Sequence, residues 1–300
     1  MAQGSRWLNW TVSGIRAVLR GAGFRMETLE GSPPIRLWRR RLRKRTSDAS
    51  PRVWVMVPGF GDSPLSWLPL VSLLIARGAP CDELVLIELP GGVGSKHSEI
   101  IPTADELMRR LGETVSALAP TVLLGQSMGG YLAAWVAAMV PLPGLQRLVL
   151  MCPSGLVLLN RPEGAWMDVL TGLPDGKVDA FLDKAMEGMA SKPAFRIPAQ
   201  WFAAELGNYL RRTDVHDFLR SFREGHEMDG KIGRISVPTL LIWGESDRLV
   251  PFFLFEHWKG ELQASGLPHA FLTLPGTGHG VHIEQSRSVA RAIRRFTDAI

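Results

Sequence analysis

From residue 52 onward, short apolar runs alternate with segments in which apolar residues recur at helical spacing. The runs predict strands at Arg52–Val57, Glu83–Leu89, Val122–Gly125, Arg147–Met151, Thr239–Trp243 and Ala270–Leu274. The segments between them predict helices at Ser66–Ala76, Ala104–Leu118, Met128–Val140, Pro251–Leu262 and Gln285–Ala299. Strands separated by helices favour parallel pairing through right-handed crossovers. The pattern therefore predicts an α/β fold, with a mostly parallel central sheet and helices on both faces.

The first fifty residues have a different pattern. Residues 5–20 place tryptophan and aliphatic side chains among arginines, which predicts a short amphipathic helix that ends at Gly21. The segments Phe24–Glu30 and Ile35–Leu42 are strand-like and are joined by glycine and proline residues, so they predict an antiparallel hairpin. We expect residues 1–50 to form a basic N-terminal region, a helix and a hairpin, that leads into the sheet.

The alternation of strands and helices is interrupted at residues 153–231. This segment contains helical stretches such as Lys177–Met189 and Gln200–Arg211, but no convincing strand. It predicts a helical insertion between two core segments, residues 51–152 and 232–300. The 300 residues and the 46% hydrophobic content are sufficient for one large domain with an insertion or for two domains.

Charge and cysteine content narrow the possible partners and compartment. Residues 1–50 hold eleven basic and three acidic residues, a net charge of +8, whereas the other 250 hold 23 and 26, a net of −3. Basicity confined to one end indicates a surface patch, and we expect no nucleic-acid partner. The two cysteines, Cys81 and Cys152, lie beside predicted strands and are expected to be buried free thiols. With neither a membrane-spanning run nor a secretory signal, we expect a cytoplasmic protein.

The best candidate nucleophile is Ser127. It lies in Gly125-Gln126-Ser127-Met128-Gly129, directly after a predicted strand and directly before a predicted helix. This spacing matches the G-x-S-x-G nucleophile elbow, in which a sharp turn exposes the serine and leaves no room for neighbouring side chains. Gly125 and Gly129 are the residues that provide this room. A glycine-rich turn into a buried helix is the alternative interpretation, but the partners downstream favour the elbow.

Two candidate partners for Ser127 follow strands later in the chain. Ligands bind at the carboxyl ends of strands in parallel sheets, and this is where Asp247 and His279 fall. A serine nucleophile needs a base to take its proton and a carboxylate to orient that base. Glu245 is an alternative acid and His282 an alternative base, but the glycines on both sides of His279 favour His279. Asp247 could instead be only a helix cap.

Together these motifs resemble the α/β-hydrolase family over about residues 50–300. Within that family, Met151–Leu156 and Met228–Ile232 are similar to segments of bacterial lipases and membrane-associated monoacylglycerol lipases. The resemblance implies that residues 153–231 form a helical cap over the site and that the substrate is a carboxylic ester with an apolar acyl group. It also implies that the backbone N–H groups of Phe60 and Met128 form the oxyanion hole.

The substrate-facing residues depend on the cap. Its large apolar side chains could either line an acyl pocket or pack the cap onto the body: Met186, Met189, Phe195, Trp201, Phe202 and Phe218. A carbon–carbon bond hydrolase or an acyltransferase could use the same three residues, and a non-catalytic ligand-binding relative is a further alternative. We expect no cofactor and no metal. The basic residues 1–45, with Trp7 and Trp10, predict peripheral contact with a membrane surface.

Overall fold

The computed structural model describes residues 2–42, 50–92, 101–156, 206–222 and 225–298, with side chains from Val12 onward. These residues form an eight-stranded sheet with strand order β1-β2-β4-β3-β5-β6-β7-β8. The strands are β1 (Arg25–Leu29), β2 (Ile35–Arg41), β3 (Val53–Val57), β4 (Glu83–Glu88), β5 (Val122–Gln126), β6 (Arg147–Met151), β7 (Thr239–Gly244) and β8 (Ala270–Leu274). Each strand lies within two residues of its predicted bounds, so the predicted α/β sheet is confirmed.

Most of the sheet is parallel. β3 to β8 pair in parallel, whereas β1 and β2 form the predicted antiparallel hairpin and β2 also pairs antiparallel with β4. Every residue of β3, β4, β5 and β7 is buried. Their continuous aliphatic sequences follow from this position, because a parallel strand covered by helices on both faces has no solvent-facing side.

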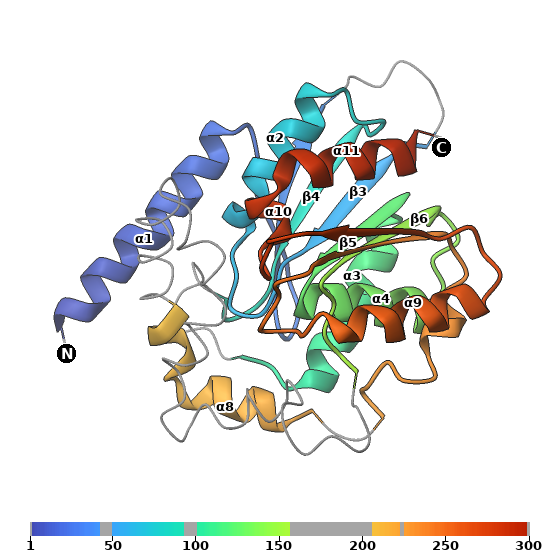
Figure 1. Cartoon of the computed structure of the whole chain (residues 1–300). Coiled ribbons are helices and arrows are strands. Elements are labelled where there is room, and N and C mark those ends of the chain that lie inside the picture. The colour runs from blue at the N-terminus through green and yellow to red at the C-terminus, as the bar shows by residue number, and fades with distance from the viewer. Residues whose placement is uncertain (1, 43–49, 93–100, 157–205, 223–224, 299–300) are drawn as a thin grey trace.

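Helices cover the two faces of the sheet. On one face lie α2 (Leu68–Ala76), α10 (Val281–Glu284) and α11 (Ser286–Thr297), and on the other lie α3 (Ala104–Leu118), α4 (Met128–Met139) and α9 (Phe253–Ala264) (Figure 1). The 3₁₀ helix η1 (Pro64–Trp67) precedes α2. Thr103 and Glu106 form a capping box that fixes the start of α3. The sequence predicted one C-terminal helix, but the structure has a separate short turn, α10, before α11.

The N-terminal helix is longer than predicted. α1 spans Ala2–Gly21, and its last turns pack on the body through the buried side chains of Ile15 and Leu19. Its first turns extend away from the sheet (Figure 1). None of the helices in the described part of the chain is long and apolar enough to cross a membrane.

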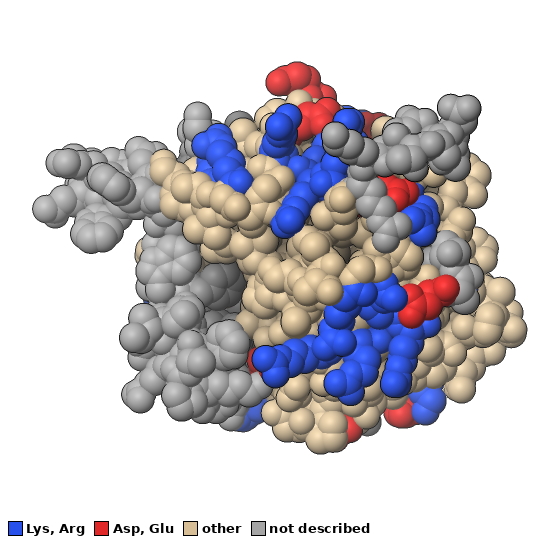
Figure 2. All heavy atoms as spheres, turned by 90° about the horizontal axis from the view of Figure 1, so that it is seen from above, with Lys and Arg blue, Asp and Glu red and all other residues tan. Residues whose placement is uncertain are grey.

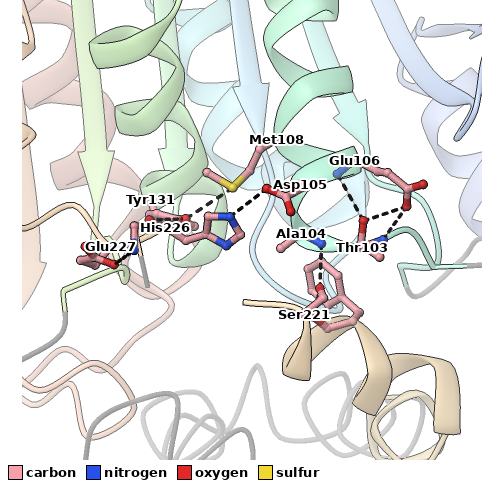
Figure 3. A network of polar contacts seen from close by, with 11 residues as sticks. Thr103, Ala104, Asp105, Glu106, Met108, Tyr131, Ser221, His226 and Glu227 are labelled. Atoms are coloured by element: carbon pink, nitrogen blue, oxygen red, sulfur yellow. Dashed lines mark hydrogen bonds and ion pairs between the residues drawn. The ribbon is translucent and has the colours of Figure 1, made fainter. Parts of the chain in front are cut away.

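Helix α8 (Thr213–Arg220) belongs to the predicted insertion and is tied to the body by polar contacts (Figure 3). The backbone N–H of Ala104 donates to Ser221 Oγ at 2.7 Å. Further along, Tyr131 Oη donates to the carbonyl of His226 at 2.6 Å, and the His226 ring lies 2.9 Å from Asp105 Oδ1. These bonds connect the segment around α8 to both α3 and α4. Most of the insertion, residues 157–205, lies outside the described residues, so the division into core and cap stays a prediction.

Candidate active site

Ser127 lies on a sharp turn between β5 and α4. Its φ of +54° and ψ of −122° are strained for a residue with a side chain. Space at the turn depends on glycine, because a Cβ on Gly129 would collide with the carbonyl oxygens of Val57 and Pro58, and one on Gly125 would collide with the backbone of Gly129. The turn therefore has the local geometry that the sequence predicts for a nucleophile elbow.

The structure brings Asp247 and His279 together. Asp247 Oδ2 lies 2.7 Å from His279 Nδ1, while Oδ1 accepts hydrogen bonds from the backbone N–H groups of Leu249 and Val250, both at 2.9 Å. The Asp247 carboxylate is buried, and these contacts hold its position. The alternative acid, Glu245, accepts a hydrogen bond from Thr273 Oγ1 instead. Asp247 therefore caps the turn through Oδ1 and is directed at the imidazole through Oδ2.

The loop that carries His279 is held by two further side chains. Glu284 accepts hydrogen bonds from the backbone N–H groups of Gly278 and Gly280, at 3.1 and 3.2 Å. Gln126, the neighbour of Ser127, donates from Nε2 to the carbonyl of His279 at 3.2 Å. The backbone on both sides of His279 is thus held in place, and its carbonyl is linked to the serine turn through Gln126.

His282, the alternative base, lies in a different environment. It is only 2% exposed, and neither ring nitrogen has a hydrogen-bond partner among the described residues. Its ring centroid is 5.1 Å from that of Trp67. Burial and the neighbouring His279 lower the pKa of His282 to about 3, so this ring is neutral at physiological pH. Within the described part of the chain, no carboxylate is hydrogen-bonded to His282 to orient it as a base.

The loop after β3, Pro58–Asp62, lies against the serine turn. A Cβ placed on Gly59 would be 2.6 Å from Gln126 Oε1 and 3.4 Å from Ser127 Cβ. The backbone N–H of Phe60 has no acceptor among the described residues. Met128 is the first residue of α4, so its N–H has no acceptor within the helix. Both N–H groups are thus available in the region beside Ser127 where a substrate oxygen would need donors.

One acidic residue of this loop was not singled out from the sequence. Asp62 Oδ1 accepts a hydrogen bond from the Ser63 N–H at 2.7 Å, and Oδ2 accepts one from Ser66 Oγ at 2.6 Å. Burial raises the pKa of Asp62 to about 6, although Ser66, Ser63 and the nearby His279 each lower it. Asp62 lies two residues after Phe60 in the loop, but no motif links an aspartate at that position to a role.

A cavity borders the serine turn. Its described lining combines the loop after β3 with apolar side chains of several elements: Gly59, Gly61, Asp62, Leu89, Pro90, Gly92, Ile101, Pro102, Leu107, Met128, Tyr209 and Phe218. Phe218 of α8 stacks on Phe60 with ring centroids 6.1 Å apart. Phe218 therefore lines the cavity and also packs the insertion onto the body. The other five predicted pocket residues, Met186, Met189, Phe195, Trp201 and Phe202, lie outside the described residues.

Cys152 lies behind the Asp247–His279 pair. Ligand atoms of these three residues lie within 4.8 Å of one another, and they are the one such cluster among the described residues that could hold a metal ion. A thiol must lose its proton to bind a metal well, but burial and the charge of Asp247 raise the pKa of Cys152. We therefore interpret the cluster as a hydrogen-bonded support for Asp247. Neither Cys81 nor Cys152 forms a disulfide, and both thiols are buried, as expected.

Comparison with known proteins establishes the family. The model of the alpha/beta hydrolase family matches residues 54–292, most of the chain. The protein therefore belongs to the alpha/beta hydrolase family, in agreement with the sheet order and the strand-turn-helix placement of Ser127.

The chain is also similar to named members of the family. Monoacylglycerol lipase abhd6-B of Xenopus laevis is 25% identical over 265 residues, with 82% of this chain and 75% of the relative covered. Monoacylglycerol lipase ABHD6 of Homo sapiens is 24% identical over 268 residues with the same coverage. Among solved structures, a membrane phospholipase A described as a bacterial virulence factor superposes with a TM-score of 0.73 at 19% identity, covering 97% of this chain and 92% of that one. The esterase EaEST of Exiguobacterium antarcticum gives a TM-score of 0.69 at 16% identity, covering 90% and 98%.

Proposed function

We propose that the protein is a serine hydrolase that cleaves carboxylic esters with an apolar acyl group, as an esterase or a monoacylglycerol-type lipase. The observation that carries this proposal is the 2.7 Å contact between His279 Nδ1 and Asp247 Oδ2, on the same rim as the strained turn of Ser127. The monoacylglycerol lipases among the relatives support the choice of substrate class.

In the proposed mechanism, His279 Nε2 takes the proton of the Ser127 hydroxyl as Oγ attacks the ester carbonyl. Asp247 holds the ring with Nδ1–H directed at its carboxylate and stabilises the imidazolium. The N–H groups of Phe60 and Met128 bind the oxyanion. His279 then gives its proton to the departing alkoxide, which leaves as the alcohol. Water, deprotonated by His279, then attacks the acyl-enzyme, and His279 returns that proton to Ser127 Oγ as the carboxylic acid leaves.

The test is a series of p-nitrophenyl esters and monoacylglycerols of increasing chain length, assayed with the wild type and with Ser127→Ala. We expect longer chains to be preferred over acetate, because each buried methylene contributes about 0.8 kcal/mol. Ser127→Ala should abolish turnover while the protein remains folded. Fastest turnover of acetate, with a steady decline for longer chains, would refute the apolar acyl pocket. Ester cleavage that survives in Ser127→Ala would refute the nucleophile.

We also propose that the basic N-terminal region contacts a membrane surface. Figure 2 shows Lys and Arg side chains gathered on the face that carries α2 and α11, where Arg77, Arg287, Arg291 and Arg295 are exposed.

In the N-terminal region itself, two arginines of β2 form ion pairs, Arg36 with Glu88 and Arg39 with Glu83. The attraction to anionic lipid is therefore expected from α1 rather than from the hairpin.

Vesicle sedimentation tests this membrane proposal. Removal of residues 1–20 would expose the sites of Ile15 and Leu19 in the core, so a Trp7→Ser/Trp10→Ser double variant is the better probe. It should bind less to anionic vesicles than the wild type, and binding of the wild type should weaken as salt rises. The double variant Arg287→Glu/Arg291→Glu tests, in the same assay, whether the basic surface on α2 and α11 also binds the vesicles. Equal binding of the wild type and the tryptophan variant would refute a role for α1.

A further inference from the structure

Asp62 is the one carboxylate among the described residues that line the cavity beside Ser127. The cavity walls are otherwise glycine backbone and mostly apolar side chains. Asp62 is half-buried, and a carboxylate in such surroundings is costly unless donors satisfy it, in agreement with the raised pKa of Asp62. The position therefore calls for an explanation beyond the local turn, since an uncharged side chain would avoid the cost of burying a charge.

The hydrogen bonds of Asp62 leave capacity for a ligand. Each carboxylate oxygen accepts one protein donor, Oδ1 from Ser63 N–H and Oδ2 from Ser66 Oγ. A carboxylate oxygen can accept two hydrogen bonds, so each retains one free lone-pair direction. The two bonds fix the side chain, and it borders the cavity with that capacity in place.

The chemistry of the ester bond places the alcohol near Asp62. In the proposed mechanism the alcohol oxygen receives its proton from His279, so the alcohol must lie beside the imidazole. His279 is also close enough to Asp62 to influence its ionisation. The acyl oxygen is assigned to the N–H groups of Phe60, which lies in sequence between the cavity-lining residues Gly59 and Gly61, and of Met128, which lines the cavity itself. A negative carboxylate is unfavourable next to an oxyanion, so Asp62 suits the alcohol side.

We propose that Asp62 binds a free hydroxyl of the departing alcohol and thereby selects esters of polyols, such as glycerol, over esters of simple alkanols. This inference rests on the proposed ester hydrolase function and adds the alcohol as a second determinant of specificity. The alkyl group of a simple alkanol would cover the carboxylate without offering it a hydrogen-bond donor. A polyol has a second hydroxyl on the carbon next to the ester-bearing carbon, and this hydroxyl can donate to the carboxylate. Asp62 thus discriminates through the hydroxyl that only the polyol ester has.

The experiment compares two esters of the same fatty acid, the ethyl ester and the 2-hydroxyethyl ester, which differ by a single hydroxyl. The ratio of their kcat/KM values is measured for the wild type, for Asp62→Asn and for Asp298→Asn. Asp298 is an exposed residue after α11 and serves as the matched control. Asp62→Asn should lower the ratio about tenfold, the change expected for loss of a charged hydrogen bond, and any effect common to both esters cancels in the ratio. Asp298→Asn should leave the ratio unchanged.

An unchanged ratio in Asp62→Asn, or an equal loss on both esters, would overturn the proposal, because Asp62 would then act only on the turn or on the shared chemistry. The wild type gives a second readout that needs no substitution. Its ratio should fall as pH is lowered from 8 to 5, because Asp62 is protonated below a pKa of about 6. The steps of the proposed mechanism are common to both esters, so their pH dependence cancels in the ratio, and Tyr209 stays protonated throughout. Failure of the wild type to cleave either ester would instead refute the ester hydrolase function.

Discussion

Two loops of the site each carry an aspartate near the imidazole of His279, and the hydrogen bonds of the two aspartates differ. In the loop after β7, Asp247 accepts two backbone N–H groups on one oxygen and faces His279 with the other, so it is fully committed to the protein. In the loop after β3, Asp62 accepts one donor on each oxygen and borders the cavity. In the roles we propose, Asp247 orients the base because both of its oxygens are committed to protein partners, whereas Asp62 binds a ligand because each of its oxygens keeps one free acceptor position.

The largest expected effect separates these two carboxylates. Asp247→Asn should lower kcat on a simple p-nitrophenyl ester by about 10⁴-fold, because an amide favours the wrong imidazole tautomer. Asp62→Asn should change the same rate by less than about tenfold, because a simple alcohol offers it no hydroxyl. Steady-state kinetics on both purified variants measure the contrast. Comparable losses in the two variants would contradict the division of roles.

The second prediction extends the comparison to the two histidines. His282 is neutral when folded, with a pKa of about 3, but has a pKa near 6.5 when unfolded. Because its pKa is lower in the folded state, its contribution to stability is present above pH 6.5 and is lost as pH falls toward 3. His282→Leu should therefore lose less stability than the wild type between pH 7 and pH 4, by up to several kcal/mol. Urea unfolding at both pH values measures this difference.

The same variant tests the choice of base. His282→Leu should retain most of the esterase activity at neutral pH, whereas His279→Ala should lose nearly all of it. The reverse order of activities would show that His282 is the base and that the contact between His279 and Asp247 is structural.

The third prediction concerns the cost of keeping Asp62 charged. Its pKa is raised on folding, from 3.8 to about 6, so the folded state is disfavoured as pH rises through that interval. Asp62→Asn should therefore raise the free energy of unfolding at pH 8, by at most about 3 kcal/mol, and should change it little at pH 4. Chemical denaturation at the two pH values provides the measurement. A variant that is less stable than the wild type at pH 8 would mean that the Ser63 and Ser66 bonds outweigh the burial.

The smallest effect tests how the loop of His279 is held. Glu284→Gln keeps one acceptor oxygen for the N–H groups of Gly278 and Gly280 but loses the charge and the second acceptor. We expect kcat to fall about tenfold with KM nearly unchanged, because the imidazole is displaced and the cavity is not. Glu256→Gln on the exposed face of α9 is the matched control. A loss confined to KM would indicate that Glu284 acts on the substrate cavity instead.

Much of this arrangement follows from the sequence. The central strands β3, β5 and β7 are short, aliphatic and buried on both faces, so the apolar runs located them, and the carboxyl ends of the predicted strands located Ser127, Asp247 and His279. Their catalytic roles stay predictions, but the 2.7 Å contact is what those roles require.

Other features depend on contacts that no local pattern encodes. The approach of Gly59 to Ser127 and the environment of Asp62 arise when the loop after β3 folds against the turn after β5, nearly seventy residues later. The burial of His282 against Trp67 likewise joins segments more than two hundred residues apart. Glu284 lies only five residues after His279, but its hydrogen bonds to the N–H groups of Gly278 and Gly280 depend on how the loop folds back on α10.

The central claim is that Ser127 is a nucleophile activated by His279, and labelling with a fluorophosphonate tests it most directly. Intact mass followed by peptide mapping should show a single adduct, on Ser127, in the wild type. No adduct should form in Ser127→Ala, and labelling of His279→Ala should be slowed by orders of magnitude, whereas His282→Leu should label at close to the wild-type rate. An adduct on another residue, or labelling of Ser127 that does not depend on His279, would contradict the account.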